Sequence, residues 1–365
     1  MPTPEKGGSM NAAIISLGSQ SSVMVAEAMK NYFSQVEMLD LKKLEVTLGK
    51  EAGVWYEGKI LPHYDCIYVK GSFRYAQLLG SLATLLEGKI SYMPLKASAF
   101  TIVHHKLLTH LALQQHNIPM PRTYVSSTVE AAKELLKKVN YPVVMKFPEG
   151  TQGKGVMFAE SPGSASALLD AMGVLKQPVL VQEYVETEGT DIRALVVGEK
   201  VIAAMRRKAK SGEQRANIHA GGTGAAVQLE QKTAKIAVAA AQALGADVCG
   251  VDILESSLGP VVIEANISPG LQGLQKVSSL NLADEIAKFF FAKTEEALKK
   301  KTKGVAQEVL HDLGKDLLMQ EIIAQLQFRG ERVLLPEFVT QLAKLREQKE
   351  YVIRAQKGKV EIEEM

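Results

Sequence analysis

The sequence predicts an α/β protein that opens with a doubly wound parallel sheet and closes with a small α+β module. From residue 11 to about residue 95, short apolar runs alternate with amphipathic stretches, which is the pattern of parallel strands joined by crossover helices. Two later apolar runs, 250–254 and 261–265, flank a short turn and predict a hairpin. At about Lys293 the composition becomes more charged, which marks the start of the terminal module.

The composition favours a globular protein and argues against a nucleic-acid or membrane partner. The chain has 365 residues, enough for two or three domains, with ordinary contents of 46% hydrophobic and 23% charged residues. A net charge of +3 is too small to indicate nucleic acid or an acidic membrane surface. No apolar run approaches the roughly 20 residues of a membrane span, and Cys66 and Cys249 have no metal or redox spacing. We therefore expect a soluble cytoplasmic protein with buried thiols.

The N-terminal unit begins with an apolar run, residues 11–17, that predicts a buried strand. Gly18–Ser22 predicts a turn into an amphipathic helix that reaches about Phe33. Residues 36–39 and 66–70 predict two more strands, with helices between and after them. The Gly18–Ser22 segment also fits a weak phosphate loop, but we interpret it as a turn because most such loops only reverse the chain.

The middle of the chain predicts helices that alternate with paired strands. The segment Ile118-Pro-Met-Pro121 ends a helix and starts an extended stretch, because proline cannot continue a helix. Turn residues separate the apolar runs that follow. The expected helices are 103–116, 130–139, 231–244 and 282–291, and the expected strands are 142–147, 156–159, 179–185, 191–197 and 201–205.

The terminal module should follow a charged link at 299–303. A helix is expected at 336–345, and a hairpin is expected from strands 351–355 and 360–363. An apolar stripe should pack on the body of the protein or on a neighbouring subunit, so we expect a homo-oligomer, a dimer or a tetramer. The stripe consists of Val305, Val309, Leu313, Leu317 and Ile322.

The hairpin at 250–265 carries a candidate metal site. Folding it about Leu258 places Asp252 opposite Glu264, and the two-residue period of a strand puts Glu264 and Asn266 on the same face. Three hard oxygen ligands on one face suit Mg²⁺ or Mn²⁺. Two neighbouring buried carboxylates repel each other unless a cation or proton joins them. The alternative is that both acids lie solvated on an exposed sheet face.

A second cluster indicates phosphate binding. Lys146 ends the apolar strand 142–147, and the loop Glu149–Gly155 that follows contains Gly153 and Gly155. Glycines allow positive φ angles and let backbone N–H groups approach a phosphate. The loop is not a Walker motif, because no Gly-Lys-Ser/Thr sequence opens a helix. Together with the metal hairpin, the lysine and the loop predict a nucleoside triphosphate site.

Several motifs, in order along the chain, resemble those of the RimK-type ATP-grasp ligases, the alpha-L-glutamate ligase family. The resemblance spans about Lys96 to Phe291 and implies an ATP-grasp fold behind an N-terminal pre-ATP-grasp domain. It divides the chain into domains 10–98, 99–184 (the lid), 185–292 (the metal and phosphate half) and 293–365. The motifs are Lys146-Phe-Pro-Glu-Gly-Thr-Gln-Gly-Lys-Gly-Val, Gln182-Glu-Tyr-Val185, Asp191-Ile-Arg193, Arg215-Ala-Asn217, Gly250-Val-Asp252 and Glu264-Ala-Asn-Ile-Ser-Pro-Gly270.

The resemblance also implies roles for nucleotide-binding residues. Lys106 and Lys146 resemble the two lysines that grip the α- and β-phosphates of ATP. The segment Glu183, Tyr184 and Val185 resembles the hinge, where the Glu183 carbonyl and the Val185 amide bind the adenine edge. Asp191 resembles the partner of the ribose.

Further residues are similar to the family's catalytic and metal groups. Arg215 and Asn217 resemble the pair that stabilises an acyl-phosphate. Asp252, Glu264 and Asn266 are similar to the ligands of Mg²⁺ or Mn²⁺, two ions in the family. Arg193 and Arg207 are candidates to bind a substrate carboxylate. One departure is His104-His105, which stands where the family has an Arg-Asp pair before Lys106.

The resemblance implies an ATP-dependent carboxylate–amine ligase that works through an acyl-phosphate. The expected partners are ATP, an amino acid (glutamate is favoured) and a carboxylate acceptor, either a protein C-terminus or a cofactor precursor. A carrier-protein-dependent ligase of amino-acid biosynthesis and a catalytically silent ATP-binding scaffold remain alternatives. The terminal module could also serve as an adaptor, although its mixed charges offer no clean basic face.

Overall fold

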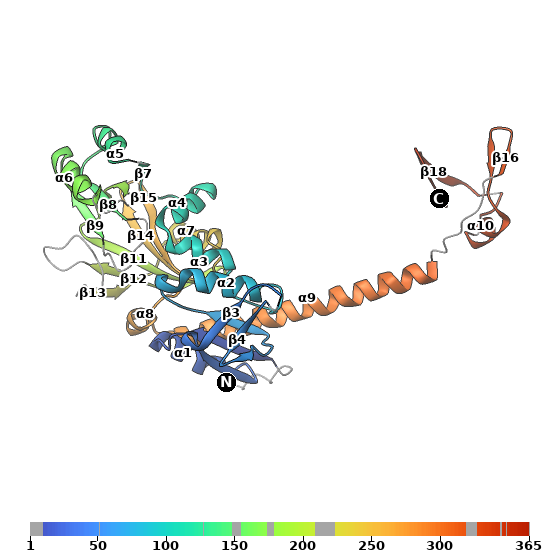
Figure 1. The fold of residues 1–365 in the computed structure, drawn as a ribbon, viewed down its shortest axis with the longest axis horizontal. Helices are drawn as coiled ribbons and strands as arrows, with labels where there is room; N and C mark the ends of the chain where they lie inside the picture. Colours follow the sequence, from blue (N-terminus) through green and yellow to red (C-terminus); the bar gives the residue numbers. More distant parts are fainter. Residues whose placement is uncertain are drawn as a thin grey trace. The chain divides into compact units, whose positions relative to one another are not determined.

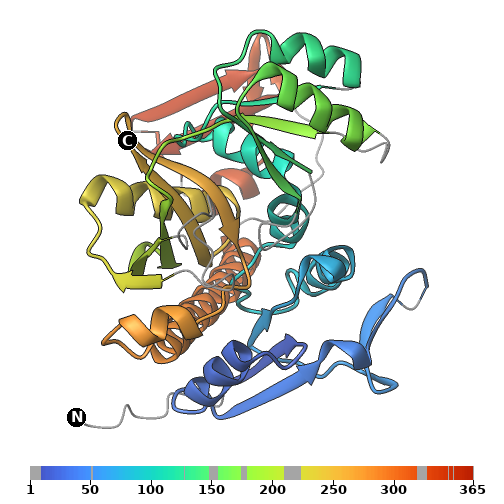
Figure 2. The same ribbon diagram turned by 90° about the vertical axis from the view of Figure 1, so that its left-hand side faces the viewer.

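The computed structural model divides into two compact units, Met1–Lys300 and Lys301–Met365, and each is described by itself. Ribbons of the chain are shown in Figures 1 and 2. The structure describes residues 10–50, 52–126, 128–147, 155–173, 179–208, 223–318, 327–343, 345–347 and 349–364, without the side chains of 302–318, 338 and 342.

The first unit begins with a parallel three-stranded sheet. Strand β1 (Asn11–Ser16) lies between β2 (Gln35–Asp40) and β6 (Cys66–Val69) and runs parallel to both. Helices α1 (Gln20–Met29) and α2 (Ala76–Leu86) follow β1 and β6. All strand residues of β6 are buried, which explains why they are almost entirely apolar. The predicted parallel α/β unit is confirmed.

The prediction of a helix between β2 and β6 is wrong. This stretch forms a small antiparallel sheet of β3 (Leu44–Thr47), β4 (Gly53–Tyr56) and β5 (Lys59–Ile60). Glu57 and Gly58 both have positive φ angles, 51° and 75°. Two successive residues with positive φ form the tight turn that joins antiparallel strands, and this turn chemistry overrides the expected helix.

The single helix predicted at 103–116 is two helices. α3 (Ala97–His104) ends and α4 (Lys106–Gln115) begins at His105, whose backbone is extended. The Nδ1 atom of His105 accepts a hydrogen bond of 3.4 Å from the N–H of Leu108, as N-cap side chains do. The break makes Lys106 the first residue of α4.

A second, antiparallel sheet has the strand order β7-β10-β8-β9. Helices α5 and α6 lie over it and close a separate apolar core (Figure 1). The predicted strands at 142–147, 156–159 and 179–185 are confirmed within one or two residues. The elements are β7 (Thr123–Ser126), α5 (Val129–Leu136), β8 (Val143–Lys146), β9 (Val156–Ala159), α6 (Pro162–Gly173) and β10 (Val179–Glu183).

A third sheet, in the order β13-β12-β11-β14-β15, is fully antiparallel and shares one core with the N-terminal strands. Gly198 forms the turn between β11 and β12 with a φ of 60°, and an added Cβ there would lie 2.4 Å from the ring of Phe289. The elements are β11 (Thr190–Val197), β12 (Lys200–Lys208), β13 (Thr223–Ala226), α7 (Gln231–Ala243), β14 (Val248–Ser256) and β15 (Gly259–Asn266).

The last helix of the first unit is longer than predicted. After α8 (Gln272–Val277), α9 runs over Leu282–Leu318, so the expected end at residue 291 and the charged link at 299–303 are wrong. Lysines 299 and 300 pair with glutamates one turn earlier, and such i,i+4 pairs stabilise an exposed helix. The side chains of the predicted stripe at 305–322 lie outside the described residues.

The first turns of α9 connect the N-terminal sheet with the third sheet (Figure 2). Phe290 is fully buried and meets the ring of Tyr68 edge-on at 5.0 Å between centroids. Leu282 and Ile286 are buried on the same face of the helix.

The second unit consists of short elements with exposed strands. The predicted hairpin is confirmed as β18 (Tyr351–Gln356) and β19 (Lys359–Glu364), and the predicted helix as α10 (Glu337–Leu342). The hairpin β16 (Gln327–Arg329) and β17 (Arg332–Leu334) was not predicted. In the part of the chain that the structure describes, no helix has the length and apolarity needed to cross a membrane.

Phe290→Ala should destabilise the protein by about 3–5 kcal/mol, because it opens a cavity where α9 meets the N-terminal sheet. The free energy of unfolding can be measured with chemical denaturant. Lys288→Ala, an exposed position on the same helix, serves as the control and should change it little. Equal effects of the two substitutions would contradict the packing role of Phe290.

Candidate active site

The β14–β15 hairpin places the predicted metal ligands as the sequence indicates. Asp252 pairs with Glu264 across the two strands, and Gly250 pairs with Asn266. Asp252 is buried, whereas the side chain of Glu264 reaches solvent. The predicted pairing of the two carboxylates is therefore confirmed, but only one of them is buried.

The pairing depends on a β-bulge that the sequence does not reveal. The turn consists of Ser257 and Leu258, so the chain does not fold about Leu258 alone, and Ile253 pairs with Val262. The register then shifts between Asp252 and Ile253 because Ile263 is an extra residue on β15. Without this extra residue, Asp252 would face Ile263 and Glu264 would be one position out of register.

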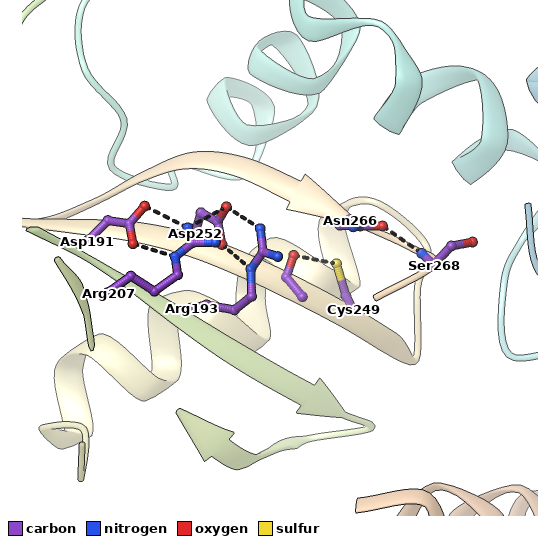
Figure 3. Close-up of polar contacts among 8 residues, drawn as sticks. Asp191, Arg193, Arg207, Cys249, Asp252, Asn266 and Ser268 are labelled. Atoms are coloured by element: carbon purple, nitrogen blue, oxygen red, sulfur yellow. Dashed lines mark hydrogen bonds and ion pairs between the residues drawn. The ribbon is translucent and has the colours of Figure 1, made fainter. Parts of the chain in front are cut away.

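Asp252 is held by two arginines. Arg193, opposite it on β11, donates from Nε and Nη2 to the two carboxylate oxygens at 2.7 and 2.6 Å. Arg207 Nη2 lies 2.9 Å from the same carboxylate (Figure 3). Burial alone would raise the pKa of Asp252, but the charges of Arg193 and Arg207 outweigh it and hold the pKa below its usual range.

The row of charges continues to Asp191. Arg207 donates from Nε and Nη2 to the two oxygens of Asp191, both at 2.6 Å, in a buried bidentate pair (Figure 3). Burial, opposed by the Arg207 hydrogen bond and assisted by the charge of Asp252, raises the pKa of Asp191 to about 6. The two aspartates and two arginines form a compact, charge-balanced row, in which both arginine forks already bind carboxylates of the chain itself.

Glu264 lies close to two lysines. Burial first, and then the charge of Asp252, raises the pKa of Glu264, while Arg193, and after it Lys106 and Lys146, lower it. The carboxylate reaches solvent, yet the protein around it removes enough hydration to shift its pKa. Among the described residues, no hydrogen bond or ion pair ends on the Glu264 carboxylate. Its oxygens can therefore bind a cation.

Lys146 is one of the two lysines near Glu264. It ends β8, and its Nζ donates to Gln182 Oε1 at 2.7 Å. Burial lowers the pKa of Lys146 to about 8, with a further lowering by Lys106 and an opposing effect of Glu264. A lysine partly stripped of water beside a second lysine favours an anionic ligand that neutralises both.

A polar network that the sequence did not suggest holds the Lys146 ammonium and reaches the backbone of Lys106. Gln182 is buried, and its Nε2 donates to Thr123 Oγ1 at 2.8 Å and to His110 Nε2 at 3.1 Å. His110 Nε2 must then be the acceptor, so Nδ1 carries the proton and donates to the Lys106 carbonyl oxygen at 2.6 Å. The sequence pointed to Gln182 only as the first residue of the motif Gln182-Glu-Tyr-Val185, at the end of the apolar run 179–181.

The proposed adenine hinge follows the same strand. Glu183 is the last residue of β10, and its carboxylate accepts a hydrogen bond of 3.0 Å from the hydroxyl of Tyr124. Tyr184 donates its N–H to the Pro142 carbonyl and packs edge-on against Phe158. Gly155, with a φ of 74°, lies close to Phe147, where an added Cβ would approach the ring to 2.9 Å.

The turn after Asn266 joins the third sheet to the N-terminal sheet. Asn266 Oδ1 accepts a hydrogen bond of 2.8 Å from the N–H of Ser268 (Figure 3). Ser268 Oγ accepts from the N–H of Gly71, and Ser21 Oγ accepts from the N–H of Leu271. The carboxyl end of the parallel sheet therefore contacts the loop that carries a predicted metal ligand.

The described side chains partly fit a divalent metal. Within the described ranges, no group of three or more His, Cys, Asp and Glu side chains has the geometry to hold an ion. The amide oxygen of Asn266 has a second lone pair, and the Glu264 carboxylate has open positions. The Asp252 carboxylate already accepts three contacts from arginines, which leaves one of its lone pairs open to an ion. Gly153, Arg215 and Asn217 lie outside the described residues.

Comparisons with known proteins agree with the motifs. A family profile described as the RimK-like ATP-grasp domain matches residues 103–290. A ribosomal protein bS6–L-glutamate ligase of Salmonella schwarzengrund is 38% identical over 262 residues, 68% of this chain and 84% of the relative. A probable alpha-L-glutamate ligase of Teredinibacter turnerae is 36% identical over 286 residues, 77% of this chain and 95% of the relative.

A solved structure shows the same fold at low identity. The RimK domain ATP-grasp protein of Sphaerobacter thermophilus aligns with a TM-score of 0.57 and 20% sequence identity, over 76% of this chain and 98% of that chain. The strand and helix arrangement of the first unit is therefore an ATP-grasp fold, as predicted.

Arg207→Gln should destabilise the protein by about 3–5 kcal/mol, because it leaves the buried Asp191 without a cationic partner. Denaturant unfolding at neutral pH measures the loss. Lys30→Gln, which breaks an exposed pair with Glu27, is the control and should have a negligible effect. A stability of Arg207→Gln equal to that of the wild type would contradict a structural role for the row of charges.

Proposed function

Since this chain belongs to the RimK-like ATP-grasp family, we propose that it joins L-glutamate to the carboxylate of an acceptor, most directly the C-terminus of a protein. The chain is an ATP-dependent ligase that forms C–N bonds, and ATP and a divalent metal are its cofactors. The relatives at 36–38% identity are named glutamate ligases, and one is named for ribosomal protein bS6. These names favour glutamate as the amino acid and a protein such as bS6 as the acceptor.

One observation supports the location of the chemistry: Glu264 faces Asp252 across the β14–β15 hairpin, and the charges of Lys106 and Lys146 reach its carboxylate. Lys106 and Lys146 would neutralise the phosphates of ATP. Asp252, Glu264 and Asn266 would hold the metal, Mg²⁺ or Mn²⁺, which supplies charge neutralisation of the phosphates when bound. We assign the ribose contact to Asp191 and the adenine edge to Glu183, Tyr184 and Val185.

The reaction has two steps that the protein assists by position and charge. An oxygen of the acceptor carboxylate attacks the γ-phosphorus, ADP leaves, and an acyl-phosphate forms. The glutamate amine then attacks the acyl carbon, phosphate leaves, and the nitrogen loses a proton. We propose that Arg215 and Asn217 stabilise the acyl-phosphate and that the glycines of the Gly153–Gly155 loop cover the phosphates. Arg193 and Arg207, which bind Asp252 and Asp191 in the free protein, are proposed to bind a substrate carboxylate in the complex.

A silent ATP-binding scaffold, a carrier-protein-dependent ligase and an acceptor of the cofactor-precursor kind are the alternatives. A scaffold would bind ATP without forming ADP, and the other two would reject a protein acceptor. A homo-oligomer, two metal ions and a cytoplasmic location remain predictions.

The proposed activity can be tested with purified bS6, L-glutamate, ATP and Mg²⁺. We expect release of ADP and a mass gain of one or more glutamates on the acceptor. Asp252→Asn and Glu264→Gln should each reduce the rate on the order of a hundredfold or more, because charge stabilisation by a metal contributes several kcal/mol. Glu255→Gln is the matched control, since Glu255 lies on the same hairpin but pairs with Arg206 near the surface.

Three results would contradict the proposal. Absence of ADP with any of the twenty amino acids would favour the scaffold. ADP release without a mass gain on bS6 would exclude that acceptor. Wild-type rates in both Asp252→Asn and Glu264→Gln would remove the metal site from the hairpin.

Binding of ATP should raise the pKa of Lys146, which burial lowers to about 8 in the free protein. Because a polyphosphate favours the ammonium form, the complex should take up roughly half a proton at about pH 8. Calorimetry in two buffers with different ionisation enthalpies measures this uptake. Lys146→Met should abolish it and weaken ATP binding, whereas the exposed control Lys138→Met should retain both. An unchanged uptake in Lys146→Met would disprove the phosphate contact.

A further inference from the structure

Lys70 is a buried cation with weak contacts at the carboxyl end of the parallel sheet. It directly follows β6, and only 4% of its surface is exposed. Its Nζ lies 3.4 Å from the carbonyl oxygen of Pro269 and 5.5 Å from the centre of the Tyr68 ring. Among the residues that the structure describes, no carboxylate lies within ion-pair distance of this ammonium.

These two contacts offset only part of the cost of burying the charge. A lysine ammonium has three donors, and one long hydrogen bond to a neutral carbonyl satisfies one of them. Lysines are almost never buried this deeply without a charged partner. Burial also lowers the pKa of Lys70 to about 8. An anion beside Nζ would supply the missing charge and the missing acceptors.

The surroundings of Lys70 connect it with the proposed reaction centre. Pro269 belongs to the turn that begins at Asn266, whose side chain accepts the N–H of Ser268. Gly71, next to Lys70, donates its N–H to Ser268 Oγ at 3.1 Å. On the other side of the turn, Gly250 lets Pro269 approach closely, since an added Cβ there would lie 3.3 Å from Pro269 Cβ. Lys70 and the proposed metal ligand Asn266 therefore flank the same short turn.

We propose that Lys70 binds a substrate carboxylate that takes no part in the reaction. This role rests on the proposed function, in which the attacking carboxylate lies at the phosphates beside Lys106, Lys146 and Glu264. Lys70 follows β6 of the N-terminal sheet, whereas Glu264 and Asn266 lie on the third sheet, so the carboxylate at its Nζ is a different one from the carboxylate that attacks. The incoming amino acid keeps its carboxylates through amide formation, and an acidic acceptor keeps those that do not react. Either molecule can supply this group.

The test compares the wild type with Lys70→Met, Lys70→Arg and the exposed control Lys42→Met in the full chain. KM values are measured separately for L-glutamate, bS6 and ATP, and the Kd of L-glutamate is measured by calorimetry with Mg²⁺ and a non-hydrolysable ATP analogue. We expect Lys70→Met to weaken one carboxylate substrate by about ten- to hundredfold, the loss of a charged hydrogen bond. The KM for ATP should stay within about twofold, and Lys70→Arg should restore part of the affinity.

Stability separates binding from a structural role. Replacing a buried, poorly paired charge by methionine should leave the melting temperature unchanged or raise it. An increase in the KM and Kd of L-glutamate identifies the amino acid as the ligand, and an increase confined to the KM of bS6 identifies the acceptor. Both results support a carboxylate site at Lys70.

Other results overturn the site and leave the proposed function to be judged separately. If wild type and Lys70→Met have equal KM values for both carboxylate substrates while the enzyme is active, Lys70 binds neither and the ligase activity stands. A lower melting temperature with unchanged KM and Kd values would make Lys70 a structural residue. If the wild type forms no ADP, the proposed function fails. In that case the Lys70 site fails as well if wild type and Lys70→Met have the same Kd for L-glutamate, or if neither binds it.

Discussion

The candidate active site depends on the register of one hairpin, which a single extra residue sets. Ile263 shifts the pairing of β15 by one position, so that Asp252 faces Glu264 and Gly250 faces Asn266. The bulge turns the strand locally and aligns the side chains that a continuous ladder would offset. Bulges are over-represented beside active sites because they re-aim side chains in this way. The positions of Asn266 and of the turn that follows it depend on the same shift.

The charges beside this hairpin form a balanced row of two aspartates and two arginines. Asp191 and Asp252 are paired by Arg207 and Arg193, all on adjacent strands of one antiparallel sheet. Each carboxylate gains a bidentate partner, which offsets the loss of its hydration. Because Arg193 and Arg207 both bind the Asp252 carboxylate, a cation at this carboxylate would share its oxygens with them. Glu264, which reaches solvent, is the most exposed of the three predicted ligands.

The lysine side of the site depends on a neutral network. Gln182 links Lys146 to His110, and His110 links in turn to the backbone of Lys106. Each donor and acceptor in this network has one consistent assignment, so the network binds the Lys146 ammonium without adding charge and ties it to the first turn of α4. The contacts at Lys70 and Gly71 are also made to neutral groups. They join the end of β6 to the turn that follows Asn266.

The sequence by itself determined the parts of this protein that follow from local pattern. Apolar periodicity identified the parallel strands and most of the antiparallel ones, and the two-residue period of β15 placed Glu264 and Asn266 on one face. Ordered motifs identified the family. These signals are local, or they are fixed by residue type, so they do not depend on which segments meet in space.

Only the tertiary structure decided what surrounds those residues. The turn at Glu57 and Gly58, the break at His105 and the extra residue at Ile263 depend on backbone angles and pairings that residue type does not fix. The partners of Asp252 come from positions 193 and 207, and the neighbours of Lys70 come from positions nearly 200 residues away. Charge pairing and burial arise where distant strands and loops meet. Local patterns along the chain do not reveal such contacts, because they do not show which distant segments become neighbours in the folded protein.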